Sequence, residues 1–307
     1  MLINEANVYF GERGYVQLVK DVLEKGVSIP DRTGVGSKAL FGATIIYDKL
    51  ENGLTDFALS TSRSCPLRLA FEEIIFFLRG ETDTRKLEEK GVFFWKGNTT
   101  REFLDNRNMK WCAEGDLGAA YSSQWRRAGD FSGVPPEACV DQLAKLLETL
   151  KHDKYSRRMV VDLWNPVEEY AMPITPCWAW SQWIVIPGED GKDYLHLSLV
   201  NRSLDALFGY PYAVQQYRLL QYMLCKMFGF EMGQMRVCLS HIHLYNSQLE
   251  YATEFVERDF GVQGQVEVNK EIKSLQDLLS VEWSDIVVSG LEVNKSPFKA
   301  KKPPMAV

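Results

Sequence analysis

The chain has 307 residues, of which 46% are hydrophobic, 25% charged and 12% aromatic. These fractions are ordinary for a folded globular protein and exclude a disordered, collagen-like or coiled-coil chain. The formal net charge of −6, from 41 acidic and 35 basic residues, argues against a partner such as polymeric nucleic acid that is bound through its phosphate backbone. A local basic pocket for a smaller anion is still compatible with that charge.

No stretch approaches the roughly 20 apolar residues that span a bilayer. The first five residues lack the basic segment of a signal peptide. The six cysteines are scattered and form no C-x-x-C pair, which argues against a zinc ribbon or a thioredoxin-type site. We therefore expect a cytoplasmic protein with reduced thiols and no membrane segment.

Helices are predicted where apolar residues recur every three to four positions, and strands where apolar and polar residues alternate. In chain order, the expected helices are 15–25, 67–78, 140–150, 212–228 and 244–255. The expected strands are 40–47, 159–164, 178–186 and 194–200. The segments 81–127 and 297–307 are expected to be irregular. No break in composition divides the chain, so we expect a single α+β domain over residues 1–307.

The cysteine at the start of the strand 178–186 is a candidate nucleophile. Cys177 follows Thr175 and Pro176. A free cysteine is usually a small buried hydrophobe, whereas a nucleophilic thiol needs a cation or a base that lowers its pKa. The sequence places no such neighbour beside it. Spacing therefore favours Cys177 only slightly over the other five cysteines.

Arginines lie at the ends of predicted strands and in one polar loop. Arg157 and Arg158 open a strand, Arg202 closes one, and Arg32 lies in a loop with two glycines. Such positions suit bidentate binding of a phosphate or carboxylate. For any one of these arginines taken alone, simple solvation is the favoured explanation.

The apolar helix 67–78 contains an acid that needs an explanation. Glu73 is either a general base or water organiser, or a structural acid paired with an arginine such as Arg68 or Arg79. The pattern does not separate these alternatives. His241 and His243 share one face of an extended segment, but no convincing third ligand accompanies them, so we expect no metal site.

Taken together and in order, several segments resemble the thymidylate synthase family. The resemblance covers nearly the whole chain. The matching segments are 31–36, 72–80, 115–126, 156–158, 176–182, 202–209, 243–245 and 305–307. The resemblance implies one catalytic domain, a mixed sheet packed by helices, and a homodimer that forms through the sheet and shares its active sites.

The resemblance also implies a role for each matched residue. Cys177 would attack C6 of a pyrimidine deoxynucleoside 5′-monophosphate as a thiolate favoured by Arg202. Glu73 would organise water for proton transfers, and Tyr121 would assist removal of the C5 proton. The residues expected to bind the nucleotide are Arg32, Gln182, Arg202, Ser203, Asp205, Ala213, His243 and Tyr245, with Arg157 and Arg158 contributed across the dimer. The co-substrate 5,10-methylenetetrahydrofolate would contact Trp95, Asp205, Gly209, Tyr212 and Val307.

Four positions depart from the family pattern. Ala213 stands where the family has an asparagine that reads the uracil edge, and alanine has neither donor nor acceptor there. Gln215 and Gln216 are both candidates to replace it, so the base, uracil or cytosine, stays open. The other departures are Trp178 for histidine, Asn201 for glutamine and Ser122 for glycine.

These departures resemble relatives that make 5-methyl or 5-hydroxymethyl dCMP or dUMP, often for viral DNA, although the dCMP hydroxymethylases would carry aspartate at position 213. If the source is viral, the expected location is the host cytoplasm. Retention of the closing tail favours a water-poor site, and therefore methyl over hydroxymethyl transfer. A non-catalytic nucleotide- or RNA-binding paralogue is the remaining alternative, but it would not need Cys177, Glu73, Tyr121 and Asp205 together.

Overall fold

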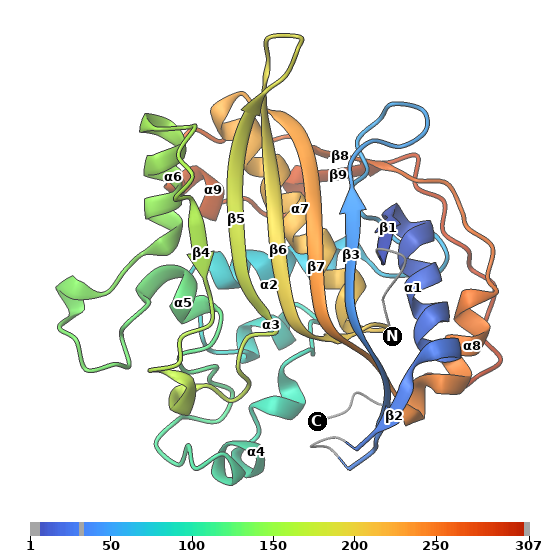
Figure 1. Ribbon diagram of the computed structural model, residues 1–307. Coiled ribbons are helices and arrows are strands. Elements are labelled where there is room, and N and C mark those ends of the chain that lie inside the picture. The colour runs from blue at the N-terminus through green and yellow to red at the C-terminus, as the bar shows by residue number, and fades with distance from the viewer. Residues whose placement is uncertain (1–6, 31–33, 304–307) are drawn as a thin grey trace.

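The computed structural model describes residues 7–30 and 34–303, which fold around a mixed seven-stranded sheet (Figure 1). Across the sheet the strands are β1 (Val8–Phe10), β3 (Ser37–Tyr47), β7 (Glu231–Tyr245), β6 (Asp193–Asp205), β5 (Trp178–Pro187) and β4 (Val160–Asp162), and β2 (Val27–Ile29) pairs with β3. The pairs β1–β3 and β6–β7 are parallel, and the others are antiparallel. The short strands β8 (Gln265–Val268) and β9 (Ile286–Ser289) form a separate pair.

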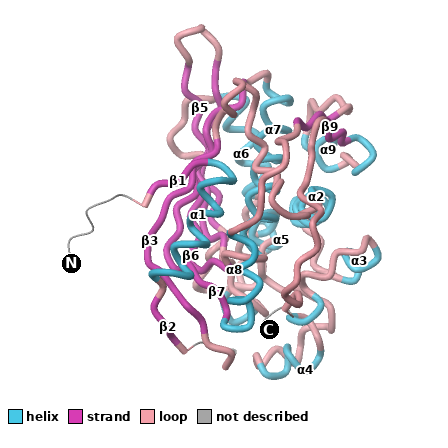
Figure 2. The backbone as a smooth tube through the Cα atoms, turned by 90° about the vertical axis from the view of Figure 1, so that its right-hand side faces the viewer, coloured by secondary structure: helices cyan, strands magenta, loops and turns pink. Residues whose placement is uncertain are grey.

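Helices gather on one face of this sheet. They are α1 (Gly11–Lys25), α2 (Leu67–Leu78), α3 (Arg85–Glu89), α4 (Arg101–Asn106), α5 (Ser122–Arg127), α6 (Gln142–His152), α7 (Gly209–Phe228), α8 (Leu249–Val256) and α9 (Leu275–Leu279). In Figure 2 the strands of the seven-stranded sheet lie on one side of the molecule, and most of the helices lie on the other, together with β9. The expected α+β class, a mixed sheet packed by helices, is confirmed.

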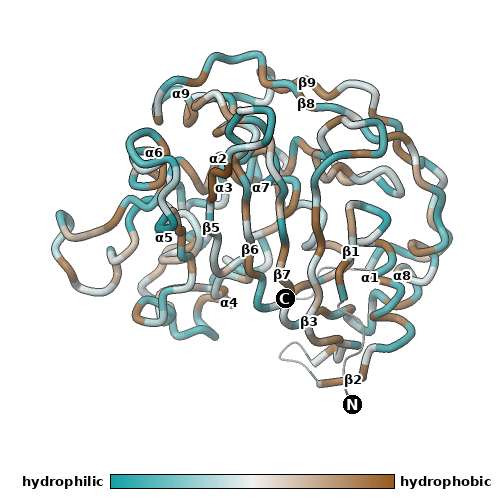
Figure 3. The backbone as a smooth tube through the Cα atoms, turned by 45° about the horizontal axis from the view of Figure 1, so that its top comes forward, coloured by the Kyte–Doolittle hydropathy of each residue, from teal (hydrophilic) through white to brown (hydrophobic). Residues whose placement is uncertain are grey.

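The core lies between the sheet and the helices α2 and α7, which pack against each other. Along β6, Leu195, Leu197 and Leu199 point into this core, and the residues between them are less buried. Figure 3 shows the matching alternation of hydropathy along the strands. The long helix α7 ends at Gly229, whose φ of +73° is the left-handed conformation that glycine adopts readily.

The other face of the sheet is not covered by any helix in the described part of the chain (Figure 2). Ile186 on β5, which alternates with the buried Val185, is 51% exposed there, and Phe41 on β3 is 80% exposed. Exposed apolar patches of this kind mark surfaces that meet another macromolecule. Dimerisation through this face stays a prediction.

Most predicted elements are present, with two corrections. The helix predicted at 67–78 has the bounds of α2, and the strand predicted at 178–186 is β5. The helix predicted at 244–255 is wrong at its start, because Leu244 still pairs with Lys38 in β7 and α8 begins only at Leu249. Arg202 does not close a strand but lies inside it, since β6 pairs with β7 as far as Asp205.

The segment 81–127, expected to be irregular, also contains the short helices α3, α4 and α5. No helix within residues 7–30 and 34–303 is long and apolar enough to cross a membrane.

Candidate active site

The candidate nucleophile lies where three segments meet. Cys177 immediately precedes β5, at a register irregularity between Trp178 and Trp180, and such bulges occur often beside active sites. The Cys177 amide donates to the Tyr121 hydroxyl at 2.8 Å, and its carbonyl accepts from the amide of Arg202 at 2.9 Å. These bonds fix the backbone that carries the thiol.

Arg202 reaches from β6 to the loop before the thiol. Its Nε donates to the Pro176 carbonyl at 3.0 Å, and its Nη2 donates to the carbonyl and hydroxyl of Thr175 at 2.7 and 2.8 Å. The guanidinium also lies 5.2 Å from the centre of the Trp164 ring, a cation–π distance. Arg202 therefore holds the loop 175–177 against β6 and places a positive charge near the thiol.

The Cys177 thiol is protonated at neutral pH in the free protein. Burial raises the pKa of this thiol, and the charge of Asp205 acts in the same direction. Arg202 and Tyr121 act to lower the pKa of the thiol, but they do not offset burial. Use of the thiol as a nucleophile consequently requires that its proton be removed once a ligand is bound.

Tyr121 occupies a strained backbone position at the start of α5. Its φ is +26°, which is unusual for a residue other than glycine. Its ring stacks on Phe77 with centroids 5.0 Å apart, and meets Trp95 edge-on at 5.5 Å. Burial, above all, raises its pKa well above the usual range for a tyrosine, so the phenol is neutral. The strain is consistent with a residue fixed for function.

Glu73 is buried on α2, with an exposed fraction of 7%. The indole Nε1 of Trp95 donates to its Oε1 at 2.6 Å, and Nε2 of Gln216 on α7 donates to its Oε2. Burial raises the pKa of Glu73 to about 7, although both hydrogen bonds act to lower it. An acid that titrates near neutrality is able to donate and accept protons there.

The structural alternative for Glu73 is wrong, because neither candidate arginine pairs with it. Arg68 donates to the Lys90 carbonyl, and Arg79 donates to the Leu279 carbonyl and to Glu282. The neighbouring acid, Glu72, is the one that forms an ion pair, with Lys90 at 2.6 Å.

A second group of predicted residues lies where β6 and β7 run in parallel. Asp205 is paired in register with His243, whose ring meets that of Tyr245 at 4.9 Å. One Asp205 oxygen accepts from the amides of residues 207 and 208, both at 3.0 Å. The other accepts from Gln248 at 3.1 Å, a contact that no local sequence pattern indicated. Ser203, two residues before Asp205, lies on the same strand.

Aromatic side chains lie at the start of α7. Gly209 is the first residue of this helix, and Tyr212 contacts Phe94 with ring centroids 4.9 Å apart. Trp95 follows Phe94 directly and meets Phe77 edge-on. Of the predicted folate contacts, Tyr212 is thus one ring of the Phe94–Tyr212 pair, and Trp95 is the sequence neighbour of the other ring.

Some predicted residues are not joined to these groups by side-chain contacts. Arg157 and Arg158 are exposed before β4, and their guanidinium groups bond to no other described residue. Gln182 on β5 donates to the Arg157 carbonyl at 3.1 Å. Arg32 and Val307 lie outside the described residues.

The departures from the family pattern are buried. Trp178 packs against Tyr210 and Tyr217 of α7, at 6.4 and 6.1 Å between ring centroids. Asn201 is 1% exposed, yet neither its Nδ2 nor its Oδ1 has a hydrogen-bond partner in the described part of the chain, and the Ser122 hydroxyl also has none. Buried polar groups of this kind are normally satisfied by ordered water or by a ligand.

The described residues contain no group of three or more histidine, cysteine or acidic side chains that could hold a metal ion. His241 and His243 do lie together, with 3.2 Å between their Nδ1 atoms. A metal-free site stays a prediction.

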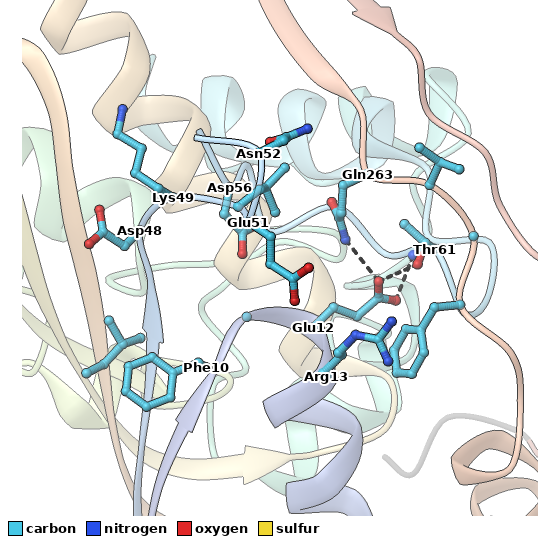
Figure 4. A pocket seen from close by; sticks show the side chains of 16 residues that line it. Phe10, Glu12, Arg13, Asp48, Lys49, Glu51, Asn52, Asp56, Thr61 and Gln263 are labelled. Carbon is cyan, nitrogen blue, oxygen red and sulfur yellow. Dashed lines mark hydrogen bonds between the residues drawn. The ribbon is translucent and has the colours of Figure 1, made fainter. Parts of the chain in front are cut away.

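A cavity of about 650 Å³ lies elsewhere, between the start of α1, the loop 48–56 and residues 260–263 (Figure 4). None of the predicted site residues lines it. Figure 4 shows Thr61 and Gln263 directed at the buried carboxylate of Glu12, which they hydrogen-bond. Glu12, which lines this cavity, is thus a structural acid whose two oxygens both accept hydrogen bonds.

The fold and the site together define a class: an α+β protein that holds a partly buried thiol beside an arginine, a neutral tyrosine and an acid that titrates near neutrality. The chain belongs to the thymidylate synthase family, whose model matches residues 13–303.

Named relatives agree with this membership. Thymidylate synthase of Ascaris suum is 33% identical over 306 residues, covering 98% of this chain and 99% of that protein. Thymidylate synthase of Saccharomyces cerevisiae is 32% identical over 278 residues, covering 87% of this chain and 90% of that protein. A probable thymidylate synthase of Schizosaccharomyces pombe is 33% identical over 287 residues, 91% of this chain, but this chain spans only 45% of that longer protein.

Proposed function

We propose that the protein transfers a one-carbon unit from 5,10-methylenetetrahydrofolate to C5 of a pyrimidine deoxynucleoside 5′-monophosphate and delivers it as a methyl group. The observation that carries the proposal is the contiguous set Cys177, Tyr121, Trp95 and Glu73, in which each side chain or backbone contacts the next. The relatives' names, thymidylate synthase, support the same activity with dUMP.

In this proposal Cys177 adds to C6 of the base. The sulfur–C6 bond forms as the electron pair of the C5=C6 double bond moves onto C5, which makes C5 nucleophilic. The thiol first loses its proton, and the positive charge of Arg202 stabilises the resulting thiolate. C5 then forms a bond to the one-carbon unit, and C5 loses its proton as the bond from that carbon to the folate nitrogen breaks. Hydride delivered to the same carbon completes the methyl group as the Cys177 sulfur is expelled and the C5=C6 double bond is restored.

Glu73 and Tyr121 carry the protons. With a pKa of about 7, Glu73 is present in both protonation states at neutral pH, so it serves as acid and as base through bound water. The neutral Tyr121 phenol donates or accepts a hydrogen bond next to Cys177. Asp205, Ser203, His243 and Tyr245 would bind the nucleotide, together with Arg32, Gln182 and Arg202.

The folate supplies the one-carbon unit and the hydride that reduces it. The residues present fit such a ligand: Phe94, Trp95 and Tyr212 offer aromatic faces for a flat bicyclic ring. Asp205, partly exposed at the end of β6, offers a carboxylate to the ring's N–H groups. Gly209 allows close approach at the start of α7, and Val307 would close the site.

We also propose that the chain is a single catalytic unit that pairs through the open sheet face. Phe41 and Ile186 supply exposed apolar surface there. The guanidinium groups of Arg157 and Arg158 bond to no other described residue of this chain, which leaves them for the phosphate site of a partner subunit. The six free cysteines agree with a reducing cytoplasm.

The test is to incubate the protein with methylenetetrahydrofolate and dUMP, dCMP, UMP or CMP separately and to identify the nucleotide by mass. A methylated product with dihydrofolate supports the proposal. A hydroxymethyl product with tetrahydrofolate would replace methylation by hydroxymethylation. Nucleotide binding without any C5 chemistry would point to a non-catalytic binder. Cys177→Ala is expected to lose turnover by about 10,000-fold or more while still binding nucleotide.

A further inference from the structure

Ala213 lacks a side chain that reads a base, but a polar side chain follows it one turn along the same helix. Gln216 lies three residues after Ala213 on α7, so the two share a helix face. Both are buried, with exposed fractions of 6% for Ala213 and 4% for Gln216. A buried carboxamide is therefore available beside the position where the family's asparagine is missing.

The structure separates the two glutamines that the sequence left as alternatives. Gln216 donates from Nε2 to Oε2 of Glu73, and thus belongs to the set around the candidate nucleophile. Gln215 instead donates to the Cys65 carbonyl at 3.3 Å. Only Gln216 is bonded to a residue of the proposed active site.

While Glu73 is ionised, its contact with Gln216 fixes which end of the Gln216 amide is free. A carboxamide has a donor end and an acceptor end, whereas an ionised carboxylate only accepts. Because the donor end is bonded to Glu73, the acceptor Oε1 is the end left for a ligand. No hydrogen bond joins this Oε1 to another residue of the described chain.

This remaining acceptor discriminates between pyrimidines at position 4. Cytosine carries an amino group there, which donates, whereas uracil carries a carbonyl oxygen, which only accepts. An oxygen facing an oxygen in a buried site leaves both without a hydrogen bond, which is unfavourable. Placed against position 4, the Gln216 Oε1 therefore suits the amino group of cytosine. Placed against position 3 it would instead accept from the N–H that uracil carries there.

We propose that Gln216, tied to Glu73, replaces the missing side chain at position 213 as the base-reading residue. Its Oε1 lies against position 4 of the base and selects a cytosine nucleotide over a uracil nucleotide. The inference rests on the proposed function, because it assumes a pyrimidine nucleotide at this site. It adds a specificity-determining residue and the identity of the base.

The test compares kcat/KM for dCMP and dUMP, with methylenetetrahydrofolate, in the wild type and three variants. The wild type is expected to favour dCMP by about 10- to 100-fold. Gln216→Ala should bring the two substrates close to parity, mainly by losing activity on dCMP. Gln215→Ala is the matched control: it removes an equally buried amide of the same helix that does not contact Glu73, and the preference should persist.

Ala213→Asn provides a second test if Gln216→Ala does not fold. It supplies an amide with a free donor end, and should raise activity on dUMP relative to dCMP. A wild-type preference for dUMP, or an unchanged preference in folded Gln216→Ala, would overturn the inference while leaving the proposed function intact. No C5 product from either nucleotide would instead mean that the proposed function itself has failed.

Discussion

Glu12 on α1 and Glu73 on α2 are both buried acids, with exposed fractions of 8% and 7%, but their surroundings differ. Glu12 accepts from the amide and hydroxyl of Thr61, the amide and hydroxyl of Ser62, and the amide group of Gln263, at 2.5 to 3.0 Å. Glu73 accepts from Trp95 and Gln216 alone.

The difference separates a structural acid from a reactive one. Burial of a carboxylate is costly unless hydrogen bonds replace its water. Glu12 has donors on both oxygens, from the adjacent residues Thr61 and Ser62 and from Gln263. Glu73 has one donor on each oxygen, too few to offset burial, and its pKa therefore rises to about 7. An incompletely satisfied carboxylate is what proton transfer near neutral pH needs.

Substitution of the reactive acid should have the largest effect. Glu73→Gln keeps the shape of the side chain but cannot exchange a proton, so turnover is expected to fall by about 1,000-fold. The fold should persist, since the Gln216 amide can turn to present its oxygen. Steady-state kinetics together with circular dichroism checks this, and near-normal turnover in a folded Glu73→Gln protein would remove Glu73 from the chemistry.

Substitution of the structural acid should act on stability instead. Glu12→Gln leaves several buried donors without an acceptor, and is expected to lower the free energy of unfolding by about 4 kcal/mol. Urea unfolding measures this loss. Turnover per folded molecule should match the wild type, and a large fall in kcat without a loss of stability would break the distinction between the two acids.

The raised pKa of Glu73 also makes stability depend on pH. Between the ordinary value of 4.5 and the folded value of about 7, the folded protein holds a proton that the unfolded chain has released. This contribution to stability is complete below the lower value and is lost as pH rises through the upper one, by about 3 kcal/mol in all. Glu73→Gln should lack this loss, as urea unfolding of both proteins at about pH 5 and about pH 8 would reveal. Parallel changes in both proteins would mean that Glu73 does not titrate as stated.

The smallest effect is expected when Glu73 loses one of its two hydrogen-bond donors. Trp95→Phe takes the indole N–H from Glu73, which raises its pKa further, so the alkaline limb of the pH–rate profile should move to higher pH. We expect about a tenfold loss of kcat at neutral pH. Trp111→Phe, at a site that is 54% exposed, is the matched control and should leave the profile in place.

Local patterns predicted the elements that carry the site better than they predicted its contacts. The helix 67–78 has its predicted bounds because apolar residues occupy every one of its turns. The local sequence is therefore enough to indicate a buried helix. The strand β7 was not predicted, since its mixed sequence becomes a strand only by pairing with β3 and β6 on either side. For the same reason Arg202 lies within a strand that was expected to end near it.

The environment of Glu73 depends on contacts between residues that are far apart in the sequence. Its partner Trp95 is 22 residues away and Gln216 is 143 residues away. Periodicity within α2 marks the acid as buried but does not say which donors reach it. The resemblance identified Cys177, Tyr121 and Glu73 as a set, while the structure was needed to separate Gln216 from Gln215.

The most direct test of the central claim is methylenetetrahydrofolate-dependent release of tritium from C5-labelled dCMP and dUMP. Cys177 addition at C6, with proton transfer through Glu73, predicts release by the wild type, a fall of about 1,000-fold in Glu73→Gln and no release in Cys177→Ala. Glu12→Gln should release tritium at the wild-type rate per folded molecule. Release that persisted in Cys177→Ala would contradict the covalent mechanism.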